Sequence, residues 1–175
     1  VLQLDVMPSM RSLQMAGPAL ERDHTGLYNC SYAAIDSLDA FSELLYILMQ
    51  GTGVGYSVED RYICRLPRIK KQKRKALHVH AIPDTTDGWC DALKLGLNTW
   101  FAGEDIEFDY STIRPAGSRL KTMGGKASGP EPLRRLLVFA RERILKRQGR
   151  RLRTVDAHDI ICKIGECVVA GGVRR

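Results

Sequence analysis

The segment 27–58 most constrains the fold, because it has the pattern of a strand, a helix and a second strand. The apolar and aromatic residues around Cys30 predict the first strand. A helix is expected to begin near Asp36 and Ser37, which are both N-cap residue types, to follow an apolar face at helical spacing and to end at Gly51. Residues 54–58 alternate and predict the second strand. Such a unit favours parallel strands and an α/β architecture.

The flanking segments have their own patterns. A proline after Met7 predicts an extended piece or a turn over residues 7–11. Apolar spacing predicts further helices at 89–101 and 132–148 and a last one from Thr154, with short strands at 77–82 and 106–110. Residues 114–130 contain four glycines and predict a long loop, and loops of this length are often functional.

The chain of 175 residues is strongly basic, with a net charge of +7. Its size predicts one domain, and 44% hydrophobic and 27% charged residues are typical of a globular protein. Much of the excess charge lies in residues 65–75 and 134–153. This keeps open an alternative function, a non-catalytic basic module that binds nucleotides or nucleic acid.

The five cysteines are odd in number and irregularly spaced, which argues against a disulfide framework and favours a reducing, cytoplasmic setting. No apolar run reaches the ~18 residues of a membrane span, and the first residues do not have the pattern of a secretory signal. Both ends are expected to continue into something longer.

Two glycine-rich stretches do not fit the nucleotide motifs that they suggest. The run 51–55 precedes a strand, and Tyr56 occupies the position of the third Rossmann glycine. These glycines are expected to allow close backbone approach or positive φ. In the run 125–128, Ala127 stands where a phosphate loop needs Ser or Thr. This loop can still offer backbone N–H groups and cations to a phosphate.

No metal site is predicted. His78 and His80 share a face of their predicted strand, and His158 and Cys162 share a helical face, but neither pair has further ligands at convincing spacing. Surface or packing roles are favoured for both pairs. The residues alone leave Cys30 open between a buried small hydrophobe and an active thiol.

Longer blocks of the sequence resemble ribonucleotide reductase. They are Met7–Arg11, Ala16–Leu20, Asn29–Tyr32, Gly51–Val58, Phe108–Ser111, Arg114–Pro115, Leu120–Thr122, Gly124–Leu133, Asp159–Glu166 and Gly171–Arg175. Their order and spacing are most similar to the adenosylcobalamin-dependent (class II) enzymes of the monomeric, ribonucleoside-triphosphate type. The resemblance implies a ten-stranded α/β barrel of two half-barrels. Residues 1–175 would form a single partial domain in the first half-barrel, with 61–109 as an insertion.

The resemblance also implies site residues. Cys30 would be one of a redox pair that reduces the ribose and is restored by thioredoxin or a similar dithiol. Ser9, Met10 and Asn29 would lie near the substrate. A deoxynucleotide effector would be bound by Asp36, Arg114, Arg119, Lys121 and Lys126.

Several implied components lie outside these residues. Adenosylcobalamin would be bound mainly by parts absent from this chain, and the second redox cysteine would belong to the remaining half of the barrel. No metal ligand, no membrane contact and a monomeric complete enzyme in the cytoplasm are expected. Without these components, the chain is not expected to turn over substrate.

Overall fold

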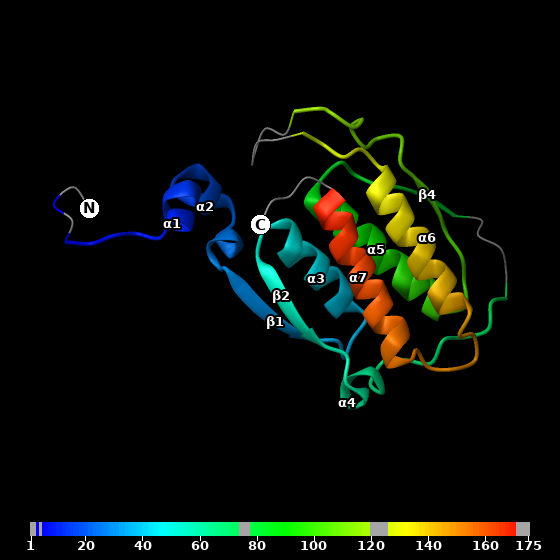
Figure 1. Ribbon diagram of the computed structural model, residues 1–175. Coiled ribbons are helices and arrows are strands. Elements are labelled where there is room, and N and C mark those ends of the chain that lie inside the picture. The colour runs from blue at the N-terminus through cyan, green and yellow to red at the C-terminus, as the bar shows by residue number, and fades with distance from the viewer. Residues whose placement is uncertain (1–2, 4, 74–77, 120–125, 171–175) are drawn as a thin grey trace.

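The first predicted unit is present as two parallel strands joined by a helix. The computed structural model describes residues 3, 5–73, 78–119 and 126–170 (Figure 1). Strand β1 (Cys30–Ala34) pairs with β2 (Gly53–Ser57), and helix α3 (Asp39–Met49) connects them. The register places Cys30 opposite Gly53 and Tyr32 opposite Gly55.

A second β-α-β unit follows in the chain. Strand β3 (Val79–Ala81) pairs in parallel with β4 (Glu107–Asp109), and helix α5 (Thr86–Phe101) lies between them in sequence. The short helix α4 (Asp60–Ile63) precedes this unit, and α6 (Glu131–Leu145) and α7 (Thr154–Ala170) follow it. The predicted helices and short strands are therefore confirmed, and so is the α/β class.

Four helices enclose the core. Helix α7 packs against α6 and α3, and α5 packs against α3 and α6, so the four lie side by side (Figure 1). Their contacts bury large side chains completely, including Phe41, Leu44, Trp100, Leu136 and Ile160. Sheet β1–β2 lies against one side of this helical layer, where α3 and β2 are in contact.

Local signals explain where the helices begin and end. Thr85 caps α5, because its side chain accepts a hydrogen bond from Gly88 N at 2.9 Å. Gly51 and Gly103 follow α3 and α5 with φ of +85° and +79°, which favours glycine. At Gly103 a Cβ would meet the carbonyl oxygen of Lys71 at 2.6 Å, so the close approach also requires glycine.

The prediction of an extended piece or a turn over residues 7–11 was wrong in part. Residues 7–11 are not wholly extended, because helix α1 (Met10–Met15) begins immediately after Ser9, whose hydroxyl accepts from Ser12 N at 3.1 Å. Pro8 restricts only Met7 and does not prevent a helix two residues later. Of the two cap types expected at the start of α3, Ser37 accepts a hydrogen bond from Ala40 N at 3.2 Å, and the helix begins at Asp39.

The remaining N-terminal elements are α2 (Pro18–Arg22) and a 3₁₀ turn (Thr25–Leu27), which lie beyond the amino ends of β1 and β2 (Figure 1). The predicted stop at residues 171–172 lies outside the described residues. Among the helices of the described ranges, none has the length and apolar character needed to cross a bilayer.

Candidate functional site

Cys30 begins β1 and is exposed on the sheet face that the helices do not cover. Side chains alternate between the two faces of a strand. Val54 and Tyr56 of β2 pack against the core, whereas Tyr32, two residues after Cys30, is 64% exposed. Cys30 and Tyr32 therefore point to the open face, and the thiol is available to solvent rather than packed in the core.

Two glycines of β2 leave the open face free beside this thiol. A Cβ at Gly53 would meet nothing closer than the Asn29 carbonyl oxygen at 3.6 Å, and one at Gly55 nothing closer than the Ser31 carbonyl oxygen at 3.7 Å. Neither residue has positive φ. The expectation of positive φ holds for Gly51 but not for these two. Backbone conformation and packing of the described residues thus do not require glycine at 53 or 55.

Arg11 holds the N-terminal segment against the amino ends of both strands. Its guanidinium donates to the carbonyl oxygens of Gly26, Tyr28 and Gly51 at 3.0, 3.2 and 3.3 Å. Thr52 Oγ1 also donates to Tyr28 O at 2.8 Å, which joins the entry to β1 to the entry to β2. Ser9 and Met10, the predicted substrate residues directly before Arg11, therefore lie at the strand end where Cys30 is located.

Ser9, Met10 and Asn29 are all exposed at this end of the sheet. Asn29 Nδ2 approaches Cys30 Sγ at 3.6 Å, and Met10 is 85% exposed although it is apolar. Sequence reasoning missed Arg11 and the face shared by Cys30, Gly53 and Gly55. The parallel register is the signal that places these two glycines on the same face as Cys30.

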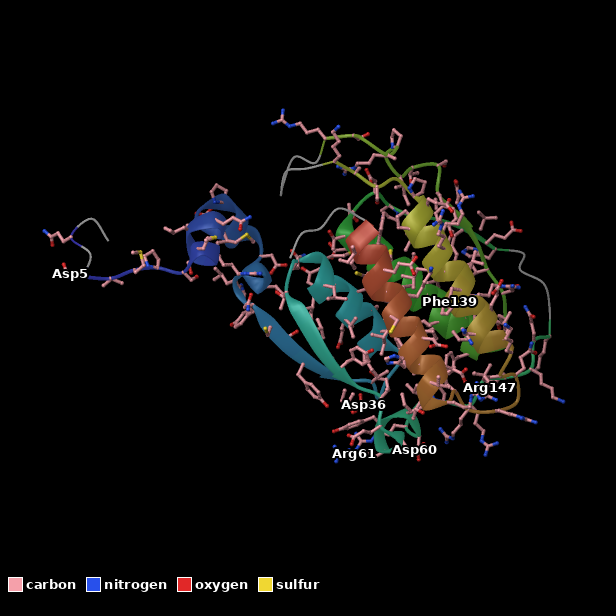
Figure 2. All side chains as sticks on the ribbon, viewed as in Figure 1. Asp5, Asp36, Asp60, Arg61, Phe139 and Arg147 are labelled. Carbon is pink, nitrogen blue, oxygen red and sulfur yellow. The ribbon has the colours of Figure 1, made fainter. Side chains whose placement is uncertain are left out.

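The predicted effector residues are separated in the described part of the chain. Asp36 follows β1 and pairs with Arg65 at 3.0 Å, beside α4 (Figure 2). Arg114 belongs to the loop before α6 and pairs with Asp84 at 2.5 Å. The described residues of that loop lie at the opposite end of the helical layer from Asp36 (Figures 1 and 2).

Residues 117–119 of this loop pair with residues 126–127. Arg119 and Lys126 form an isolated antiparallel bridge, and both side chains are exposed. Backbone bonds from Gly117 N to Ala127 O and from Ala127 N to Ser118 O, at 2.8 and 2.7 Å, reinforce it. Lys121 lies outside the described residues. Within the described ranges, Arg119 and Lys126 have no carboxylate partner, so these two side chains can reach an anion without first breaking an ion pair.

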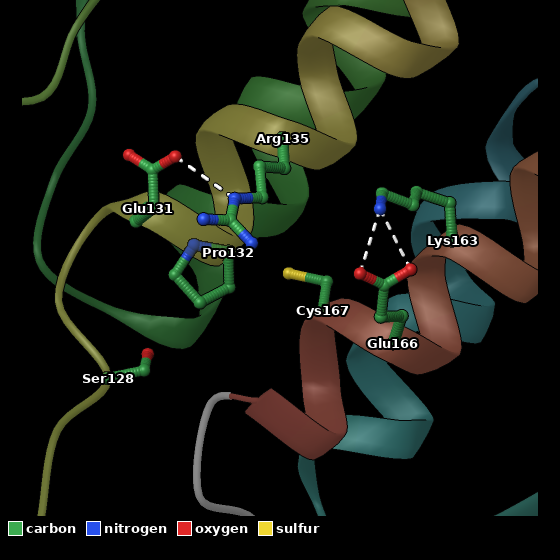
Figure 3. A pocket seen from close by; sticks show the side chains of 7 residues that line it. All are labelled: Ser128, Glu131, Pro132, Arg135, Lys163, Glu166 and Cys167. Carbon is green, nitrogen blue, oxygen red and sulfur yellow. Dashed lines mark hydrogen bonds and ion pairs between the residues drawn. The ribbon is translucent and has the colours of Figure 1, made fainter.

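A cavity of about 250 Å³ lies between the start of α6 and the end of α7 (Figure 3). Its charged side chains are already paired, Arg135 with Glu131 at 3.1 Å and Lys163 with Glu166 at 2.8 Å. Burial raises the pKa of the Cys167 thiol at its wall to about 12, so this sulfur is protonated at neutral pH. The cavity is smaller than the ~300–1,000 Å³ of ordinary ligand sites.

Of the other cysteines, Cys90 and Cys167 are buried, whereas Cys64 and Cys162 are exposed. Cys90 is buried in α5, and burial raises the pKa of its thiol to about 12. Cys64 is exposed, and its Sγ approaches the Arg61 carbonyl oxygen at 3.4 Å. Among the described residues, no group of three or more His, Cys, Asp or Glu has a metal-binding arrangement. His80 packs edge-on against Phe108.

Two basic segments that are distant in sequence form one surface, here called the basic surface (residues 65–73 and 146–153). Backbone bonds join them, from Ile69 N to Arg150 O at 2.9 Å and from Gly149 N to Ile69 O at 2.8 Å. Arg151 also donates to the Cys64 carbonyl oxygen at 2.6 Å. Within the described ranges, the exposed cations of this surface that have no carboxylate partner are Arg68, Lys70, Lys71, Lys73, Lys146, Arg150 and Arg151.

Comparison with known proteins gives consistent results. Residues 59–144 match the family model described as "B12-dependent ribonucleotide reductase, insertion domain". The adenosylcobalamin-dependent ribonucleoside-triphosphate reductase of Euglena gracilis is 32% identical over 184 residues, which cover 100% of this chain and 25% of that protein. The protein of the same name from Lactobacillus leichmannii is 32% identical over 229 residues, covering 98% of this chain and 31% of the relative.

A solved structure has the same fold over most of the chain. The crystal structure of a B12-dependent (class II) ribonucleotide reductase superposes with a TM-score of 0.81 and 31% identity, covering 94% of this chain and 31% of that one. The chain thus spans about a quarter to a third of the length of these relatives. The matched region 59–144 contains the predicted insertion 61–109, whose limits stay a prediction.

Proposed function

We propose that this chain, which belongs to the B12-dependent (class II) ribonucleotide reductase family, supplies the reducing thiol Cys30 and part of the substrate cleft of a ribonucleoside-triphosphate reductase. The complete protein would convert ribonucleoside triphosphates to deoxyribonucleotides in the cytoplasm. The observation that carries this proposal is the exposed thiol at the start of a strand, opposite a glycine that neither backbone conformation nor packing requires.

The thiol chemistry balances only with a second cysteine. Replacing the 2′-hydroxyl by hydrogen takes two electrons and two protons and releases water. Two thiols provide them and end as a disulfide, which thioredoxin or a similar dithiol would reduce again. Cys90 and Cys167 are buried, Cys162 lies on α7, and Cys64 directly follows α4. We therefore place the second thiol in the remaining half of the barrel.

A rigid strand suits the role proposed for Cys30. The backbone of β1 is held by its ladder to β2 and by the Arg11 and Thr52 hydrogen bonds at its amino end. A reacting group needs such support, because small displacements at a reacting centre reduce rates strongly. The amide of Asn29, 3.6 Å from the sulfur, would orient the thiol or contact the ribose. Ser9 and Met10 would border the same cleft.

The cavity between α6 and α7 does not fit the cofactor that the relatives' names specify. The cavity between α6 and α7 is too small for adenosylcobalamin, and its charges are paired with each other. We derive no step through the cofactor and assign its binding to other parts of the reductase.

We further propose the loop with Arg114, Arg119, Lys121 and Lys126 as the phosphate-binding part of an effector site for a deoxynucleotide. The exposed cations Arg119 and Lys126 suit a triphosphate. Asp36 would join this site only if another contact brought it there, because it now pairs with Arg65 on the far side of the helical layer. Deoxynucleotide binding should fall about tenfold in Lys126→Ala. Binding should be unchanged in Arg68→Ala, which removes a cation from the basic surface.

The reductase proposal is tested by joining the chain to its natural continuation and measuring deoxyribonucleotide formation from ribonucleoside triphosphates. Activity that requires added adenosylcobalamin and a dithiol supports it. A complete, folded protein that reduces no ribonucleotide under these conditions would overturn it. Sedimentation of the same sample tests the expectation of a monomer.

One observation favours a second function, the basic module for nucleotides or nucleic acid. The basic surface joins seven exposed cations that have no carboxylate partner in the described ranges, and polyanions bind such surfaces by releasing counterions. Binding to DNA or RNA that weakens steeply with salt, together with no reductase activity, would favour this function. Tight deoxynucleotide binding with negligible nucleic-acid affinity would favour the reductase.

A further inference from the structure

A cluster of three polar side chains lies away from Cys30, between β2 and α7. Tyr56 of β2 places its phenol oxygen 2.9 Å from Nδ1 of His158. The other ring nitrogen of His158, Nε2, lies 3.5 Å from the sulfur of Cys162, one helical turn further along α7. The phenol oxygen is 3.8 Å from that sulfur. His158 and Cys162 are both exposed, so solvent reaches the cluster.

We propose that His158 Nε2 and Cys162 Sγ form a binding site for a thiophilic divalent metal ion of the Zn²⁺ class. Zinc bonds of ~2.0–2.1 Å to nitrogen and ~2.3 Å to sulfur, at a tetrahedral angle, place the two ligand atoms about 3.5 Å apart. The observed separation of 3.5 Å matches this value before any metal is added. The spacing of four residues in a helix keeps both ligands on one face.

Tyr56 provides the partner that such a histidine needs. A metal-binding imidazole usually donates its second N–H to a nearby acceptor, which fixes the tautomer and the ring direction. Tyr56 Oη occupies that position at Nδ1, so a metal on Nε2 leaves Nδ1–H to donate to the phenol oxygen. Tyr56 also packs against the core, which limits its movement and therefore that of the ring. The tyrosine acts here as a positioning residue.

The site is open and binds through two protein side chains, with water in the remaining positions. Sequence reasoning noticed the His158–Cys162 spacing but favoured packing, since zinc sites normally have more cysteines in closer pairs. The contribution of Tyr56, 102 residues away in sequence from His158, is visible only in the fold. Occupation of this site would connect β2 and α7 more firmly through the ordered imidazole.

The test is titration of the full chain with Co²⁺, a spectroscopic substitute for Zn²⁺, under reducing conditions. We expect a saturable thiolate-to-metal absorption band that Zn²⁺ displaces. Cys162→Ser and His158→Gln should each lower the affinity at least tenfold, and Tyr56→Phe should lower it about tenfold while the band remains. Cys64→Ser, which removes another exposed thiol, should leave the titration unchanged.

The proposal is overturned if no saturable band forms, or if the band survives Cys162→Ser at full intensity. It is also overturned if His158→Gln leaves the affinity unchanged, because the sulfur then binds metal alone. Far-ultraviolet circular dichroism of each variant establishes that α7 remains folded. The titration does not depend on reductase activity, so its result is independent of the function proposed above.

Discussion

Replacement of Gly53 by alanine tests whether this glycine is required for stability or for turnover in the proposed substrate cleft. Gly53 lies opposite Cys30 in the parallel ladder, on a backbone without positive φ. A new Cβ would meet its nearest neighbour, the Asn29 carbonyl oxygen, at 3.6 Å, which is ordinary van der Waals contact. The substitution should therefore raise the free energy of unfolding by about 0.4–1 kcal/mol, because it restricts the unfolded chain.

The same substitution, Gly53→Ala, should lower turnover. The added methyl group fills part of the open face beside the thiol, where the proposed substrate would lie. Displacement of a substrate by about 1 Å can reduce the rate by about 10²-fold, so we expect kcat/KM to fall by about 10- to 100-fold. The assays are thermal denaturation and deoxyribonucleotide formation by the complete protein.

Gly165→Ala is the matched control, since a Cβ at this position of α7 meets no atom within 4 Å. Alanine in a helix should raise stability by about 0.5–1 kcal/mol and leave turnover unchanged. Full activity of Gly53→Ala would refute the idea that the glycine keeps the cleft open. A loss of stability in Gly53→Ala would show instead that packing requires the glycine.

Three further predictions concern stability and order. Asp156→Ala should lower the free energy of unfolding by about 3–5 kcal/mol in urea, because Asp156 is 4% exposed and its loss leaves the mostly buried Arg147 unpaired. The exposed pair of Glu131 and Arg135 is the control, and Glu131→Gln should cost at most about 1 kcal/mol; equal effects would contradict the burial argument. A hydrogen bond from Arg141 lowers the pKa of Asp105, so the ionised Asp105 carboxylate stabilises the fold relative to the variant Asp105→Asn. This difference in the free energy of unfolding should be present above about pH 4 and be lost as the pH falls through the folded-state pKa. A difference that persists unchanged in strong acid would exclude this cause. Arg11→Ala should speed chymotrypsin cleavage within residues 10–28 while the thermal midpoint of the helical core stays nearly constant, and unchanged cleavage would show that Arg11 does not hold this segment.

The regular elements were predictable because their signals are local. The apolar spacing of α5 and α6 and the glycine after α3 specify these elements without distant contacts. The β-α-β pattern at 27–58 also predicted the parallel pairing of β1 with β2. The capping residue of α3 stayed open between Asp36 and Ser37, because both are cap types in sequence, and the fold shows that Ser37 accepts from Ala40 N.

The site was less predictable, because it depends on which distant residues meet. The register that places Gly53 opposite Cys30 follows from strand pairing and not from spacing along the chain. The contacts of Arg11 with Gly26 and Gly51 span 15 and 40 residues. Likewise, the pattern could place a cation at Arg114 but could not show that Asp84 pairs with it.

The central claim is that Cys30 is a reducing thiol, and the most direct test is deoxyribonucleotide formation by the complete protein with a thioredoxin reductant. We predict that Cys30→Ser abolishes multiple turnover, while Cys64→Ser, which removes an exposed cysteine on another element, retains it. Binding of substrate and the thermal midpoint should be nearly unchanged in both variants, since Cys30 is exposed and outside the core. Full thioredoxin-dependent turnover by Cys30→Ser would contradict the claim.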